Sequence, residues 1–130
     1  MAKVTGIGGV FFRAKDPKAL QAWYVENLDL PDINGYIIFQ NKDETQPEAY
    51  AVWAPFKQDT EYFGSDQQSF MINFRVDDLD GVRERLRQAG AEVDEKTEDS
   101  EFGKFGWAVD PEGNRFELWE PPATPFSADT

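Results

Sequence analysis

The sequence predicts an α+β fold that contains two copies of one βαβββ unit, and three observations predict it. The chain has 130 residues, which is the size of one compact domain. Short apolar segments of strand type are interrupted twice by segments with the apolar spacing of a helix. Residues 12–16 also resemble residues 74–78, and residues 50–55 resemble residues 116–121. Because both matches occur in the same order and in the same kinds of element, they indicate an internal repeat.

The first copy spans about residues 5–60. Asp16 and Pro17 supply an N-cap and a first helical residue. Apolar residues such as Leu20 and Tyr24 then recur at the spacing of one helix face. The expected elements of this copy are a strand at residues 6–14, a helix at residues 17–28, and strands at residues 36–40 and 49–55.

The second copy spans about residues 67–121 and is followed by an extended tail, residues 122–130. Asp77 and Asp78 together supply the expected cap of its helix, and Gly90 marks the helix end. The expected elements are a strand at residues 70–76, a helix at residues 79–89, a strand at residues 91–96, an acidic loop at residues 97–101, and a hairpin of residues 104–109 and 115–120 around the turn 110–114. We expect a single domain over residues 1–130.

Alternation along the strands assigns their side chains to two faces, because successive side chains of a strand point to opposite sides of a sheet. The face expected to pack under the helices carries Val10, Phe12, Ala14, Tyr50, Val52, Ile72, Phe74, Val76, Phe116 and Leu118. The opposite face carries Gly9, Phe11, Arg13, Ala51, Trp53, Met71, Asn73, Arg75, Glu117 and Trp119. A mixed polar and aromatic face of this kind is what the lining of a ligand cavity requires.

The composition excludes several kinds of protein. The chain has no cysteine and no histidine, so disulfides, zinc sites with Cys or His ligands, and catalytic triads built on His are impossible. Thirteen basic and 25 acidic residues give a net charge of −12, which repels phosphate backbones and anionic membranes. We expect no nucleic acid and no membrane among the partners, although a cationic ligand is compatible with this charge. No signal-peptide or membrane-span pattern is evident, so we expect a cytoplasmic protein.

Three stretches carry a family resemblance: GGVFFRAKDPKALQAWYVENLDLP, FMINFRVDDLDGVRERLRQAGAEV and FGWAVDPEGNRFELWEP. They are similar to the vicinal oxygen chelate superfamily of glyoxalases, bleomycin-resistance proteins and ring-cleaving dioxygenases. The similarity extends from about residue 6 to residue 121, and DPEGNRFELWEP is its most specific part. It implies paired βαβββ modules whose curved mixed sheets enclose a cavity, and it often implies a homodimer.

The resemblance also implies where a metal would be bound. Members of this superfamily that are enzymes usually hold a divalent metal through residues of the first and last strands of each module. The corresponding positions here are Gly9, Ala51, Met71 and Glu117. Only the carboxylate of Glu117 suits a hard metal ion. We therefore expect no metal and no other cofactor.

Glu117 is the one carboxylate expected in the cavity, with Trp53 and Trp119 as expected neighbours. A carboxyl group buried beside aromatic rings is a candidate general acid or base. The alternative is a structural carboxylate that is paired with Arg13 or Arg75.

The remaining candidates are the side chains expected to line the cavity. Either arginine could contact a ligand, or it could be solvated and paired with acidic loops. The tryptophans could contact an aromatic ligand or could belong to the core. The candidate ligand-binding residues are Phe11, Arg13, Trp53, Met71, Asn73, Arg75, Trp107 and Trp119.

Two classes of function remain open. The first is a protein that binds a small organic molecule in a largely metal-free cavity without turnover. The second is a lyase or isomerase that uses Glu117 as a general base, with no metal or a weakly held one. The sequence does not decide between them.

Overall fold

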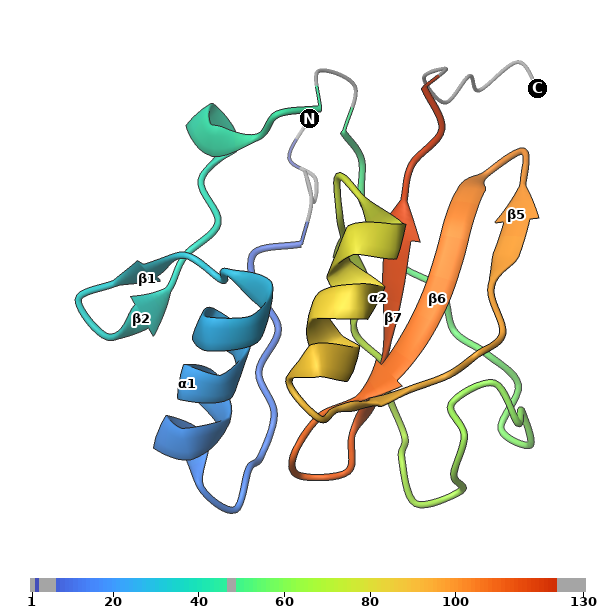
Figure 1. The fold of residues 1–130 in the computed structure, drawn as a ribbon, viewed down its shortest axis with the longest axis horizontal. Coiled ribbons are helices and arrows are strands. Elements are labelled where there is room, and N and C mark those ends of the chain that lie inside the picture. The colour runs from blue at the N-terminus through green and yellow to red at the C-terminus, as the bar shows by residue number, and fades with distance from the viewer. Residues whose placement is uncertain (1, 3–6, 47–48, 124–130) are drawn as a thin grey trace.

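In the computed structural model, which describes residues 2, 7–46 and 49–123, two helices pack on one face of a five-stranded sheet, and a two-stranded sheet lies beside the first helix (Figure 1). This arrangement confirms the predicted α+β class. Among the described residues, no helix is long and apolar enough to cross a membrane.

Both predicted helices form with the expected caps. Helix α1 (Pro17–Leu28) begins where Asp16 accepts a hydrogen bond from the Ala19 backbone at 3.1 Å. Helix α2 (Leu79–Gln88) begins where Asp78 accepts one from the Gly81 backbone at 3.1 Å. A side-chain acceptor at the N-cap satisfies a backbone N–H that has no partner within the helix.

The large sheet is built from the second half of the chain. The last two strands of the chain form a central antiparallel hairpin. A third strand pairs in parallel with the last strand, on the side away from its hairpin partner. Two short strands share the other edge. The strands are β3 (Asn73–Arg75), β4 (Glu92–Val93), β5 (Glu98–Ser100), β6 (Gly103–Val109) and β7 (Arg115–Glu120), in the order β3-β7-β6-β4, with β5 also paired to β6.

The turn between β6 and β7 is organised by Asp110. Its carboxylate accepts hydrogen bonds from the Glu112 backbone at 2.9 Å and the Asn114 backbone at 3.0 Å. It also accepts one from the Tyr24 hydroxyl at 2.8 Å, which ties the turn to α1. Burial, followed by the bond to Asp110, raises the pKa of Tyr24. The Glu112 carboxylate accepts from the backbone of Lys15 and Asp16 just before α1, so the turn fixes the start of that helix.

The core lies between the two helices and the sheet. Alternation along β7 directs Phe116 and Leu118 to the helices, as predicted, and both are buried. Phe74 and Val76 also pack against this core, as predicted for the strand at 70–76. The fully assembled core cluster is Leu20, Tyr24, Leu79, Leu86, Ala108, Phe116 and Leu118.

The strands predicted in the first half are largely wrong. Residues 7–14 and 49–55 form no strand, and Gly6 lies outside the described residues. A short hairpin of β1 (Asp32–Ile33) and β2 (Tyr36–Ile37) forms instead, and it is followed by the 3₁₀ helix η1 (Asn41–Asp43). The polar connection after β2 contains η1, and residues 49–55 do not form a ladder with residues 36–40.

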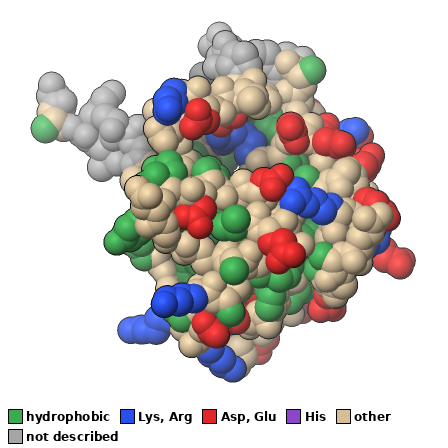
Figure 2. Space-filling model, turned by 60° about the vertical axis from the view of Figure 1, so that its left-hand side comes forward, with side chains coloured by type: hydrophobic (Ala, Val, Ile, Leu, Met, Phe, Trp, Pro, Cys, Tyr) green, Lys and Arg blue, Asp and Glu red, His purple; other side chains and the backbone are tan. Residues whose placement is uncertain are grey.

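Because these segments form no strand, the predicted alternation fails for several of their residues, although Ala14 packs against the core as predicted. Val10 and Val52 are exposed, although we expected both beneath the helices. Tyr50 contacts Trp119 with ring centroids 5.1 Å apart, on the sheet face opposite the helices. Figure 2, which brings the side of α1 and the β1–β2 hairpin forward, shows apolar side chains exposed among charged ones.

Smaller differences concern the ends of elements. The strands predicted at residues 70–76 and 91–96 form only over β3 and β4, and part of the predicted acidic loop forms β5. Residues 124–130 of the predicted tail lie outside the described residues. The pairing of two complete modules, and the boundaries of each module, stay predictions.

Candidate functional site

The face of the large sheet that points away from the helices carries the candidate site. Strand β7 presents Glu117 on this face, because Phe116 and Leu118 on either side of it enter the core. In the strand register, Trp107 of β6 lies opposite Glu117 on one side and Asn73 of β3 lies opposite it on the other. The sheet therefore places the carboxylate between an indole and an amide.

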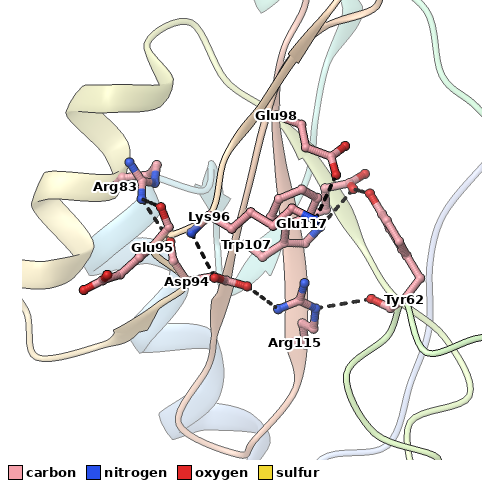
Figure 3. Close-up of polar contacts among 9 residues, drawn as sticks. All are labelled: Tyr62, Arg83, Asp94, Glu95, Lys96, Glu98, Trp107, Arg115 and Glu117. Carbon is pink, nitrogen blue, oxygen red and sulfur yellow. Dashed lines mark hydrogen bonds and ion pairs between the residues drawn. The ribbon is translucent and has the colours of Figure 1, made fainter.

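Glu117 is buried, with 7 % of its surface exposed, and hydrogen bonds surround its carboxylate (Figure 3). Its Oε1 accepts from Asn73 Nδ2 at 2.6 Å. Its Oε2 accepts from Trp107 Nε1 at 3.0 Å and from the Tyr62 hydroxyl. All three donors are neutral groups. Hydrogen bonds from neutral donors stabilise a buried carboxylate without cancelling its charge.

A connection without helix or strand, residues 56–69, covers this face and supplies Tyr62. The ring of Tyr62 meets Trp107 edge to face at 5.9 Å and stacks on Phe56 at 5.4 Å. Gln68 anchors the far end of the connection. Its amide donates to the Arg115 carbonyl at 2.7 Å and accepts from the Arg115 backbone N–H at 2.8 Å, as a neighbouring strand residue would.

The environment of Tyr62 keeps its hydroxyl protonated. Burial raises the pKa of Tyr62, and the hydrogen bond and the charge of Glu117 raise it further. The phenol is therefore a hydrogen-bond donor to Glu117 throughout the neutral range. Sequence reasoning missed both Tyr62 and Gln68. The only signal for them was that residues 56–69 are unusually rich in aromatic side chains for a polar connection.

The cations beside Glu117 each have an acidic partner. Arg115 lies 3.3 Å from Asp94, and its guanidinium also lies over the Trp107 ring at 5.4 Å. The Lys96 backbone N–H and then Arg115 lower the pKa of Asp94. Lys96 lies 3.4 Å from Glu98.

On the other side of Glu117, the guanidinium of Arg75 forms an ion pair with Glu44 and donates to the Tyr50 carbonyl at 2.7 Å. Arg13 is exposed. Neither arginine forms the ion pair with Glu117 that was one of the two interpretations of this carboxylate.

The structure brings some predicted site residues together and leaves others apart. Asn73 and Trp107 bond Glu117 directly. Trp119 follows on the same face of β7, where it stacks on Phe105 and donates to the Phe102 carbonyl at 2.7 Å. Arg75 lies opposite Trp119 in the strand register, and Met71 is half-buried just before β3.

Three predicted residues of the first half lie apart from this group. Phe11 is 95 % exposed and Trp53 is 79 % exposed, and Arg13 is exposed as well. Tyr50, rather than Trp53, contacts Trp119. The cause is that residues 7–14 and 49–55 form no strand, so the strand alternation on which their placement was based does not hold. A role of these three residues in binding stays a prediction.

The described residues do not enclose a large cavity at Glu117. A groove of about 450 Å³ lies instead between α1 and the β1–β2 hairpin. Residues 56–69 occupy the space over Glu117, so access to the carboxylate requires Tyr62 to move or a ligand to bind beside it.

The donors around Glu117 do not fit a divalent metal. Of the four positions implied by the superfamily, Gly9 and Ala51 offer no side-chain ligand and Met71 offers a soft sulfur. The described residues contain no group of three Asp or Glu side chains that could hold a metal ion. The side chains that bond Glu117 donate N–H and O–H groups to it, so this carboxylate is the single hard ligand that these residues would offer a divalent metal, which prefers about six oxygen ligands.

Comparison with known proteins gives one match that covers most of the chain. The sequence model of the glyoxalase-like domain matches residues 9–119. No curated protein sequence matches at a significant level.

Two solved structures are similar in fold. The first is TnmS3, an antibiotic binding protein from Streptomyces sp. CB03234, with 20 % identity, a TM-score of 0.48, and coverage of 83 % of this chain and 88 % of that one. The second is a member of the glyoxalase/bleomycin resistance protein/dioxygenase superfamily from Sphaerobacter thermophilus DSM 20745, with 22 % identity, a TM-score of 0.49, and coverage of 92 % and 98 %. Neither structure is similar enough to this chain to indicate its ligand or its activity.

Proposed function

The chain belongs to the glyoxalase-like domain family, and from this premise we propose that it binds a small organic molecule on the sheet face around Glu117, without a metal. One observation carries the proposal. A buried carboxylate with three neutral hydrogen-bond donors lies among aromatic rings on the face opposite the core. Folding does not require an acid at this position, because the neighbouring Phe116 and Leu118 supply the core contacts of β7.

The surroundings of Glu117 match the composition of small-molecule sites, which combine apolar walls with a few polar groups that fix orientation. Trp107 and Trp119 supply aromatic surface, and Phe105 stacks on Trp119. Asn73 and Arg75 lie on the adjacent strand and offer polar groups. A ligand enters by displacing part of residues 56–69, and the aromatic surface that this segment now covers becomes the contact surface.

The hydrogen bonds favour binding over catalysis by Glu117. A general base must accept a proton from the substrate, and both oxygens of Glu117 already accept hydrogen bonds from neutral donors. We therefore propose a binding protein rather than a lyase or isomerase, located in the cytoplasm.

We also propose that the protein is a homodimer. The support is the set of large apolar side chains that the first half leaves in contact with solvent, which is more than isolated surface residues explain. They lie on residues 7–12, on β1–β2 and the residues after it, and on residues 52–56. The exposed set includes Val10, Phe11, Tyr36, Phe39, Val52 and Trp53. Light scattering after gel filtration should give twice the chain mass, and Trp53→Ser should shift it toward the monomer.

A binding screen tests the proposed site. We would titrate small aromatic compounds into the full chain and follow tryptophan fluorescence. A compound that binds around Glu117 should change the emission, and Trp119→Phe should alter that change. Glu117→Gln should weaken binding, whereas Glu84→Gln on the exposed face of α2 should not, since its side chain is 59 % exposed and remote from the sheet face. Equal binding by parent and Glu117→Gln protein would contradict a site at this carboxylate.

A further inference from the structure

We infer that the ligand is an organic cation, a protonated or quaternary amine, which binds Glu117 in the place that the Tyr62 hydroxyl now holds. This inference rests on the proposed function and adds the chemical class of the ligand. Three observations support it: the charges near Glu117, the aromatic rings around it, and the way in which its hydrogen-bond donors are attached to the fold.

The first argument is that Glu117 is a buried carboxylate without a counter-charge; Asp110 is another, but the donors of its own turn surround it. Among the described residues, no Lys or Arg nitrogen lies within ion-pair distance of Glu117, and its bonded partners are all neutral. A buried charge that lacks an opposite charge is costly, and a bound cation would remove that cost. The cations nearby are engaged with other acids, in the pairs Arg75–Glu44, Arg115–Asp94 and Lys96–Glu98.

The second argument concerns the aromatic rings. Ring faces attract cations, and such sites are typical of ammonium recognition. Trp107 already holds one cation, because the Arg115 guanidinium lies 5.4 Å from its ring centre. Trp119 and Phe105 stack on the same sheet face two register positions away from Trp107 and Glu117. An ammonium group at Glu117 would therefore bind a carboxylate, and the organic part attached to it could reach this aromatic pair.

The third argument identifies the group that gives way. Asn73 and Trp107 belong to paired strands, so their bonds to Glu117 are fixed by the sheet. Tyr62 belongs to a segment of turns that is tied to the sheet at Gln68, six residues further on, and by the bond from Arg115 Nε to the Tyr62 carbonyl at 3.3 Å; neither tie holds the Tyr62 hydroxyl itself. Figure 3 shows Tyr62 reaching Glu117 from the side opposite the helix that carries Arg83. The Tyr62 hydroxyl is therefore the donor that a ligand can replace at Oε2 without breaking the sheet.

The overall charge acts in the same direction. A net charge of −12 raises the local concentration of cations around the protein and speeds their association. The electric field of this net charge does not by itself select a binding site. It does lower the affinity of any anionic ligand for the sheet face around Glu117.

The experiment compares three probes that share one ring and differ in charge: phenethylammonium, 2-phenylethanol and phenylacetate. Each is titrated into the full chain at pH 7, and tryptophan fluorescence is followed. We expect phenethylammonium to bind about tenfold more tightly than 2-phenylethanol, since bonds between charged groups are about twice as strong as neutral ones. Phenylacetate should bind more weakly than either.

Variants locate the effect. Glu117→Gln should lower the affinity for phenethylammonium to that for 2-phenylethanol, and Glu84→Gln should leave the preference unchanged. Tyr62→Phe should raise the affinity for phenethylammonium several-fold, because no hydroxyl then competes for Oε2. Added NaCl should weaken the binding of phenethylammonium and not that of 2-phenylethanol to the parent protein, a test that needs no variant to fold.

The outcomes separate this inference from the proposed function. Equal affinity for the ammonium and the alcohol, or a preference that survives Glu117→Gln, would overturn the cation while leaving a binding site in place. Weaker binding of phenethylammonium to Tyr62→Phe would overturn the displacement of Tyr62. Failure of all three probes to bind would overturn the proposed function and this inference together.

Discussion

The two halves of the chain carry the same sequence repeat and reach different structures. In the second half, the equivalents of the repeat form β3 and β7, which pair in parallel and cover the core. In the first half, residues 10–14 and 50–55 form no strand and leave apolar side chains exposed. The helix that lies between the two segments begins at an Asp N-cap in both halves.

The difference shows that apolar alternation is not sufficient for a strand. The β6–β7 hairpin closes over a turn in which one buried aspartate satisfies several donors, so pairing is set locally. Once β7 has formed, β3 can pair with its free edge. In the described part of the first half, a two-residue hairpin turn joins β1 and β2, where Gly35 takes a φ of 88°. Residues 49–55 form no strand there, and a second copy of the chain is one source of partners for them.

The largest expected effect is a difference in stability between two substitutions at equivalent positions of the two halves. Val52 and Leu118 occupy the same place in the repeat, and their exposed fractions are 67 % and 0 %. Leu118→Ala should lower the free energy of unfolding by about 3 kcal/mol, because it leaves a cavity in the core. Val52→Ala should change it by less than about 0.5 kcal/mol. Urea unfolding followed by circular dichroism measures both.

Protein concentration sharpens this comparison. If residues 49–55 contact a second copy, the effect of Val52→Ala should be largest at protein concentrations where the parent is a dimer and should shrink on dilution to the monomer, whereas that of Leu118→Ala should not vanish on dilution. A loss at Val52 as large as that at Leu118 in the monomer would show that the first half has a buried sheet of its own, and the contrast between halves would be wrong.

The second effect tests the turn that the first half lacks. Asp110→Ala leaves the Tyr24 hydroxyl and the backbone N–H groups of Glu112 and Asn114 without their acceptor. We expect a loss of about 2 kcal/mol in the free energy of unfolding, since unsatisfied buried donors are costly. Chemical denaturation gives the value, and amide hydrogen exchange should show faster exchange in β6 and β7.

Glu112→Ala is the matched control in the same turn. It removes only the acceptor for the backbone before α1 and should cost about 1 kcal/mol, as the loss of a helix cap does. Equal losses for Asp110→Ala and Glu112→Ala would mean that the turn matters through α1 alone and not through the hairpin.

The comparison also explains what the sequence could predict. The helices, their caps and the β6–β7 hairpin follow from local signals, namely Asp16, Asp78 and the turn 110–114, and all are confirmed. The strands of the first half were predicted from alternation alone, and their pairing depends on contacts that are distant in sequence. Local patterns do not determine such contacts.

The same distinction holds at the site. Glu117 was identified because β7 is a well-determined strand with a charged residue between two core residues. Tyr62 was missed, because its position over Glu117 depends on how a segment without regular structure folds back across 55 residues. Trp53 was expected beside Glu117 because residues 49–55 were predicted to form a strand, and this strand does not form. Side chains on paired strands can be placed from sequence, and those on connections cannot.

The smallest expected effect concerns the ion pair that joins the halves. Arg85 of α2 bonds Asp29, just after α1, through two N–H groups at 2.8 and 3.1 Å. Both side chains are largely exposed, so the pair contributes little to stability. Asp29→Asn is the suitable change, because asparagine tolerates the left-handed backbone of this position, where φ is 54°.

The pH dependence of this variant shows whether the pair holds the halves together. The hydrogen bond from Arg85 lowers the pKa of Asp29 below its ordinary value of 3.8. The stabilisation is therefore present above pH 3.8 and is lost as the pH falls through the lower pKa of the folded state. The urea midpoint of the parent should exceed that of Asp29→Asn at pH 6, and the two should converge at the acid end. High salt should reduce the difference at pH 6, because the pair is exposed. A difference that is constant with pH would place its origin in the backbone at Asp29, and the two helices would then be joined by the shared core alone.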